Sequence, residues 1–293
     1  MARPIRNPGA SVRARLLNLA RKRNRPFDLL LTRYVLERLL HRLSRTPYRD
    51  RFVLKGAMLM AAWFADPHRP TRDVDLLGFG DPDPGAVLAV FREVCAVPAE
   101  DGVAFDLDSL AIDRIREDAV YGGLRLKATA TVDGAQVRVV VDIGFGDSVE
   151  PGLEELVLPV LLDLPAPRLR AYARETVVAE KFQAMVALGR ANTRLKDFYD
   201  IWLLASSHDF TGNRLAQAIA ATFQRRDTAL PLAPPEALTA AFAEDPAKQR
   251  QWRAFLADVA VDPGDLRTVL QDLAEFLMPH SRRAAAFLSD AAG

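Results

Sequence analysis

The sequence has very little cysteine and no long hydrophobic run, and both shortages restrict the class of protein. Cys95 is the single cysteine among 293 residues, so no disulfide can form within the chain, and a reducing compartment is the simplest expectation. No stretch of about 18 apolar residues is present, which predicts the absence of a membrane-spanning segment. Residues 1–27 are basic but lack an apolar core of signal-peptide length, so we expect a cytoplasmic protein.

Lysine is also scarce, with six lysines against 33 arginines, and the positive charge is unevenly distributed. Residues 1–56 hold 15 Lys and Arg against 3 Asp and Glu, a net charge of +12, whereas the rest of the chain has a net charge of −11. Clustered arginines neutralise phosphates, so this leader is a candidate RNA-binding surface. The alternative is a pair of amphipathic helices with solvated outer faces. The candidate RNA-binding residues are Arg13, Arg15, Arg21, Lys22, Arg23 and Arg25.

The apolar pattern changes its period along the chain. Helical spacing in the leader predicts a first helix from Ser11 to Lys22. The centre is rich in strand candidates, and two of them flank Asp133-Gly134, a dipeptide typical of a tight hairpin. We therefore expect a basic helical leader followed by a mixed α/β core.

From about Arg174 onward the pattern is helical to the end of the chain. Breaks between these helices are expected at Pro246, Pro263 and Pro279. The expected domains are a basic helical leader at 1–50, an α/β core at 51–170 and a helical C-terminal domain at 171–293.

Two aspartates, Asp73 and Asp75, lie one residue apart in a predicted strand. Strand alternation puts both carboxylates on one face, where they repel each other unless a cation lies between them or they reach water. Mg²⁺ is commonly held by one or two carboxylates plus substrate phosphates. Asp142 lies on a later strand and completes a candidate two-metal site. The alternative is a solvent-facing edge strand that carries two charges.

A candidate phosphate-binding turn precedes the aspartates. Lys55, Gly56 and Ala57 lie at the predicted start of a helix, where Gly56 allows close backbone approach and N–H groups bind phosphate. Such a turn followed by a D-x-D strand is the arrangement that nucleotidyl transfer requires. Thr71 is a candidate rim contact or a turn residue, and Arg72 a candidate substrate contact or a structural ion pair.

Five short segments, in this order, resemble the AbiEii/AbiGii nucleotidyltransferase-like toxins, which include the MenT-type enzymes. They are "FVLKGAMLM", "TRDVDLL", "VVVDIGFGD", "ETVVAEKFQAM" and "RLKDFYDIWLL", and the resemblance covers about residues 10–205. The family usually has Gly-Gly or Gly-Ser in the turn after the first strand, whereas this chain has Gly56-Ala57. Alanine removes a hydroxyl that reaches phosphate, so the backbone must make that contact here.

The resemblance implies an α+β fold, with a polymerase-β-like core of a small mixed sheet and flanking helices and a helical C-terminal half. It implies a toxin that uses Mg²⁺ or Mn²⁺ to transfer nucleotides from an NTP to RNA, for some members the 3′ end of tRNA. A cognate antitoxin protein is the implied partner, in a toxin–antitoxin or phage-defence system. By motif match, Asp73 and Asp75 are metal ligands and catalytic residues, Lys181 contacts the triphosphate, and Asp197 is a further catalytic or lysine-orienting carboxylate.

The residues around Lys181 agree with these roles. Lys181 interrupts an inward apolar stripe of its predicted helix, so its ammonium needs an anion within reach. Asp197 and Asp200 lie three residues apart on the next helix, so one of them is expected to pair with Lys181. The alternatives are a snorkelling lysine, and an Asp197 that only favours the helix dipole.

Two other functions remain open from the sequence. An antibiotic-type transferase modifies a small hydroxylated substrate, and it calls for an acidic acceptor pocket rather than an arginine-rich leader. A degenerate binding or regulatory module agrees with the Gly56-Ala57 departure, but it has no need of Asp73, Asp75 and Asp142 together.

Overall fold

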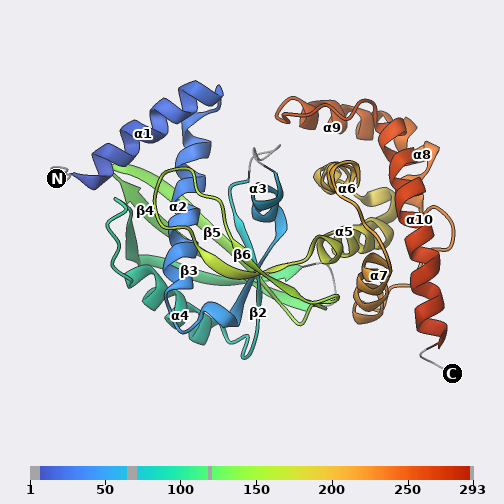
Figure 1. The fold of residues 1–293 in the computed structure, drawn as a ribbon, viewed down its shortest axis with the longest axis horizontal. Coiled ribbons are helices and arrows are strands. Elements are labelled where there is room, and N and C mark those ends of the chain that lie inside the picture. Colours follow the sequence, from blue (N-terminus) through green and yellow to red (C-terminus); the bar gives the residue numbers. More distant parts are fainter. Residues whose placement is uncertain (1–6, 65–70, 118–120, 291–293) are drawn as a thin grey trace. The chain divides into compact units, whose positions relative to one another are not determined.

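The computed structural model describes residues 7–64, 71–117 and 121–290. Its contacts divide the chain into two compact units. The first contains Met1–Gly146 and Glu155–Ala171, and the second contains Asp147–Glu154 and Tyr172–Gly293. Figure 1 follows the chain through both units.

The first unit is built on a seven-stranded mixed sheet with the strand order β3-β4-β5-β2-β1-β7-β6. The strands are β1 (Phe52–Lys55), β2 (Val74–Gly78), β3 (Ala104–Glu117), β4 (Tyr121–Val132), β5 (Ala135–Phe145), β6 (Leu153–Val157) and β7 (Arg168–Tyr172). The helices are α1 (Pro8–Arg23), α2 (Phe27–Ser44), α3 (Met60–Trp63) and α4 (Pro84–Ala96). β2 runs antiparallel to β1 and parallel to β5, which brings the D-x-D strand to the middle of the sheet.

The two faces of the central strands differ in chemistry. Leu124 and Leu126 on β4, and Val141 and Ile143 on β5, are buried on one face. Helices α2 and α4 contact β5 and β3 respectively, and Figure 1 shows them alongside the sheet. The residues between these apolar positions are mostly polar or charged and point to the opposite face. The alternation therefore buries one face of the sheet in the core and places polar and charged side chains on the other face.

Two local predictions have clear outcomes. The hairpin between β4 and β5 is confirmed, because Asp133 and Gly134 adopt φ angles of 48° and 78° and join paired strands. The first helix begins at Pro8 rather than at the predicted Ser11. The side chain of Asn7 accepts a hydrogen bond from the backbone N–H of Ala10 at 3.0 Å, so Asn7 is the N-cap.

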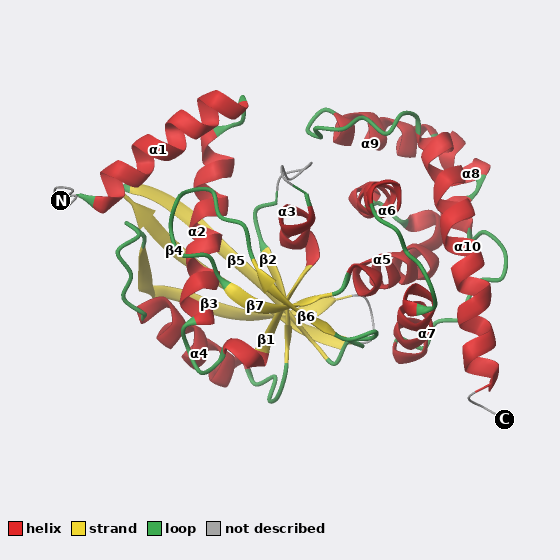
Figure 2. Ribbon diagram, in the orientation of Figure 1, coloured by secondary structure: helices red, strands yellow, loops and turns green. Residues whose placement is uncertain are grey.

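The second unit is helical, as the sequence predicts, and its helices are red in Figure 2. They are α5 (Arg174–Leu188), α6 (Leu195–Ser207), α7 (Arg214–Arg225), α8 (Ala240–Glu244), α9 (Pro246–Leu256) and α10 (Leu266–Asp290). The break predicted at Pro279 is wrong, because Pro279 lies inside α10. Buried Leu277, Met278 and Ala284 pack on both sides of the proline, so tertiary packing outweighs the lost hydrogen bond. None of the helices in the described ranges has the length and apolarity needed to cross a membrane.

Candidate active site

Four charged residues lie in register across four adjacent strands of the first unit. Arg125 on β4 is opposite Asp142 on β5, Asp142 is beside Asp75 on β2, and Asp75 is opposite Lys55 on β1. Residues paired in this way point to the same face of a sheet. The result is a row of charges, positive, negative, negative and positive, which we call the charged row. The prediction that Asp142 and Asp75 share a face is confirmed by this register.

Asp73 lies two residues before Asp75 along the chain. It immediately precedes β2, is partly buried, and accepts a hydrogen bond from the Thr71 hydroxyl at 2.8 Å. The Thr71 hydroxyl therefore orients the Asp73 carboxylate. Arg72 pairs with Asp28 of α2 at 3.1 Å, and both side chains are well exposed. This ion pair matches the structural alternative for Arg72, and a substrate contact by Arg72 stays a prediction.

Gly56 provides the space that the Asp75 carboxylate occupies. Its φ is +70°, and a Cβ built there would lie 2.0 Å from Asp75 Oδ2. Only glycine permits both this backbone conformation and this close approach. Gly56–Leu59 forms a 3₁₀ helix, which leads into the four-residue helix α3. Lys55 is 7% exposed, and Ala57 is partly buried beside Gly56.

Arg125 is a site residue that the sequence reasoning missed. Its Nε and Nη2 donate to the two carboxylate oxygens of Asp142 at 2.7 and 2.6 Å. This hydrogen bond raises the pKa of Arg125, and the charges of Asp142, Asp73 and Asp75 raise it further. The guanidinium therefore lies in the field of all three carboxylates. The hairpin at Asp133-Gly134 fixes the register, so the pairing of 125 with 142 can be counted from the sequence.

The donor chemistry fits a divalent metal on two carboxylates. Asp73 and Asp75 present only oxygen ligands, and the cradle at Gly56 leaves room for the Asp75 carboxylate. No group of three or more Asp, Glu, His or Cys residues in the described ranges is arranged to hold a metal by itself. Arg125 holds both oxygens of Asp142. Asp142 as a metal ligand therefore stays a prediction, and it requires release by Arg125.

A second charged cluster is formed by the two motif helices of the second unit. The Nζ of Lys181 on α5 lies 2.5 Å from Asp197 Oδ1 and 2.9 Å from Asp200 Oδ2, both on α6. The two aspartates are 1% and 0% exposed. The prediction that one of them pairs with Lys181 is therefore confirmed, and in fact both of them do. Arg194 adds a second cation, with its Nε 2.9 Å from Asp197 Oδ2.

The cations decide the charge state of Asp197. Burial alone would raise its pKa, but the charges of Lys181 and Arg194 outweigh burial and hold the pKa below its ordinary value. Asp197 therefore stays ionised at neutral pH and holds the lysine in a fixed position. Whether Lys181 contacts a triphosphate stays a prediction.

The N-terminal helix has the amphipathic form that the charge pattern indicates. Val12, Leu16 and Ala20 are buried. Of the candidate RNA-binding residues, five are exposed and Arg25 is partly buried, and Arg13 lies 3.9 Å from Asp133. The geometry agrees both with RNA contact and with a solvated helical face.

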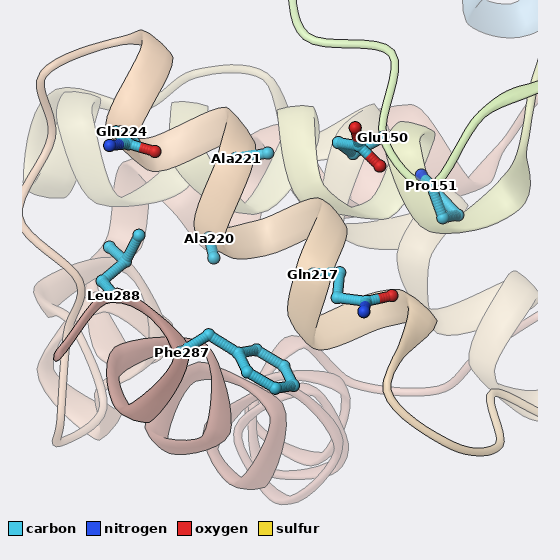
Figure 3. Close-up of a pocket in the computed structure, with 8 residues that line it drawn as sticks. All are labelled: Glu150, Pro151, Gln217, Ala220, Ala221, Gln224, Phe287 and Leu288. Carbon is cyan, nitrogen blue, oxygen red and sulfur yellow. The ribbon is translucent and has the colours of Figure 1, made fainter. Parts of the chain in front are cut away.

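The second unit also contains an open groove of about 370 Å³. Figure 3 shows it between α7 and the end of α10, with Glu150 and Pro151 at its rim. Among the described residues that line it, only Glu150 is charged, so the groove lacks the paired carboxylates of the charged row.

Comparisons with known proteins identify related folds and the family of the chain. The fold is similar to that of JHP933 from Helicobacter pylori, with a TM-score of 0.50 and 15% identity over 90% of this chain and 98% of that one. A second H. pylori structure, described as a candidate nucleotidyltransferase, gives a TM-score of 0.46 and 16% identity over 89% and 96% of the two chains. A search of curated proteins gave no significant match.

The D-x-D strand lies beside a glycine turn in the middle of a mixed sheet. The sequence profile of the family "Nucleotidyl transferase AbiEii toxin, Type IV TA system" matches residues 38–278, and the chain belongs to this family. The resemblance drawn from the five motifs is confirmed, as is the expected α+β fold. The family also implies an antitoxin as a partner.

Proposed function

We propose that this toxin transfers nucleotides from an NTP to an RNA acceptor in a metal-dependent reaction, with the 3′ end of tRNA as the candidate acceptor. The observation that carries the proposal is the charged row, in which Asp75 lies between Asp142 and Lys55 and against Gly56. The family supports the transfer chemistry, and the row supports its dependence on a cation.

Asp73 and Asp75 are the residues that would hold Mg²⁺ or Mn²⁺. The bound ion would neutralise triphosphate charge and favour ionisation of the attacking hydroxyl. Thr71 keeps the Asp73 carboxylate oriented through its hydrogen bond. Gly56 and Ala57 offer backbone N–H groups to phosphate oxygens, and Lys55 adds a positive charge at the same edge of the site.

The family resemblance assigns the triphosphate contact in the second unit to Lys181. Asp197 and Asp200 hold its ammonium through ion pairs of 2.5 and 2.9 Å. Two buried carboxylates fix the position of the lysine before any substrate arrives, and such preorganised charge lowers the barrier to phosphoryl transfer. Asp197 is thus a positioning residue in this proposal.

The RNA acceptor is supported by the basic outer face of α1. Its exposed cations are Arg13, Arg15, Arg21, Lys22 and Arg23. Such a surface binds a phosphate backbone without reading its sequence. An antibiotic-type transferase, which modifies a small hydroxylated substrate, does not require this basic surface. It therefore ranks second among the candidate functions.

The test is incubation of the full chain with each labelled NTP, Mg²⁺ and total RNA, beside parallel reactions with aminoglycoside-like polyols. Label in RNA, concentrated in the tRNA fraction, is the expected result. Label in a polyol and none in RNA would move the assignment to the second candidate. Label in neither acceptor would favour the degenerate binding module.

A further inference from the structure

Asp142 lies where a third metal ligand would be expected, but it is already bound to a cation from the chain. It is 11% exposed at its side chain, and the Arg125 guanidinium holds both of its oxygens. A bidentate guanidinium–carboxylate pair is planar and well matched in geometry, so it competes effectively for the carboxylate. The Arg125 side chain is 42% exposed, so it has solvent-side room to move away.

We propose that Arg125 is a positioning residue that competes with the divalent metal for Asp142. In this arrangement Asp73 and Asp75 would hold the ion, and Asp142 would become a ligand only when the guanidinium releases it. This inference rests on the proposed function, because it assumes a metal on the D-x-D strand.

The charge arrangement gives the physical reason. Asp142 and Asp75 are neighbours in register on parallel strands, so a cation between them would neutralise both. Arg125 neutralises Asp142 from the other side, on β4. A metal that binds Asp142 must therefore approach a guanidinium of like charge or displace it.

Lys127 provides a matched control on the same strand. It lies two residues after Arg125, so it points to the same face, and it pairs with Asp113 at 2.6 Å rather than with a carboxylate of the charged row. Lys127→Ala removes one positive charge from this face and leaves Asp142 held by Arg125. If the ion pair between Arg125 and Asp142 had no effect on metal binding, Arg125→Ala and Lys127→Ala would have the same affinity for Mn²⁺.

The experiment is a Mn²⁺ titration of the full chain without nucleotide, followed by the electron paramagnetic resonance signal of free Mn²⁺. Arg125→Ala should bind Mn²⁺ about tenfold more tightly than wild type, a change of about 1.4 kcal/mol. Lys127→Ala should remain within about twofold of wild type, because Lys127 pairs with Asp113 and both oxygens of Asp142 are held by Arg125. Arg125→Gln, which lacks the charge but keeps polar atoms, should follow Arg125→Ala and guards against a misfolded variant.

Two further backgrounds separate this inference from the proposed function. When Asp142→Asn is already present, adding Arg125→Ala should leave the affinity for Mn²⁺ within about twofold, because the carboxylate in competition is gone. Equal tightening by Arg125→Ala with and without Asp142→Asn would overturn the inference, and so would no tightening in the otherwise wild-type chain. The double variant Asp73→Asn, Asp75→Asn should lose Mn²⁺ binding. Wild-type affinity in that double variant would overturn the proposed metal site itself.

Discussion

Replacing Gly56 by alanine tests the close packing at the centre of the charged row. The new Cβ would lie 2.0 Å from Asp75 Oδ2, whereas ordinary contact begins at 3.4 Å. Alanine at the φ of +70° also costs about 1–2 kcal/mol in backbone energy. The substitution therefore combines a general loss of stability with a local displacement of one carboxylate.

Gly134→Ala separates these two effects. Gly134 has a φ of +78°, and a Cβ there would meet nothing within 4 Å. Gly134→Ala should lower the melting temperature by about 2–8 °C, because each kcal/mol moves a protein of this size by about 2–4 °C. Gly56→Ala should lower it further, since its Cβ also collides with Asp75. Displacement of a catalytic group by about 1 Å costs about 100-fold in rate, so only Gly56→Ala should lose transfer activity on that scale.

The assays are thermal unfolding by circular dichroism and transfer of labelled NTP to RNA, run on both variants below their melting temperatures. Equal transfer rates for Gly56→Ala and Gly134→Ala would refute the reasoning, because they would show that the position of Asp75 does not limit the reaction.

Three further predictions concern the second cluster and the basic helix. Lys181→Ala should lower the free energy of unfolding by about 3–5 kcal/mol and reduce label transfer, because it leaves Asp197 and Asp200 buried without the ammonium. An unchanged denaturant midpoint would contradict the role of the buried ion pairs. The stabilisation from the lowered pKa of Asp197 should be complete above about pH 4, the unfolded value, and be lost as pH falls through the lowered folded pKa. Urea unfolding between about pH 2 and 6 should therefore lose this acid-side slope in Asp197→Asn, and an identical slope would exclude the assignment. Replacing Arg15, Arg21, Lys22 and Arg23 by alanine should weaken RNA binding and reduce the slope of log K against log salt concentration by up to about 3. Mononucleotide binding should change little. An unchanged slope would show that α1 is only a solvated helical face.

Much of the first unit could be predicted from strand alternation. The period of two residues placed Asp73 and Asp75 on one face, and the Asp133-Gly134 turn marked the hairpin that carries Asp142. Arg125 was not predicted, because the pattern that indicates a metal site consists of carboxylates and does not include their cationic partners. The hairpin register already paired it with Asp142, so the information was present in local sequence.

Other features depend on packing that a one-dimensional pattern does not contain. Pro279 stays inside α10 because buried residues on both sides hold the helix together. α1 begins at Pro8 rather than at Ser11, since Asn7 caps the helix and Pro8 fits the first helical turn. The pairing of Lys181 with both aspartates follows from how α5 packs on α6, whereas the sequence predicted a pair with only one of Asp197 and Asp200.

The central claim is that Asp73 and Asp75 support metal-dependent transfer of a nucleotide to RNA. Its most direct test compares the wild-type chain with Asp75→Asn in label transfer to purified tRNA at several Mg²⁺ concentrations, with folding checked by circular dichroism. The wild-type chain should label the tRNA in proportion to bound Mg²⁺, and folded Asp75→Asn should give no label above background. Equal labelling by the two proteins, or labelling by the wild type that persists in excess chelator, would contradict the account.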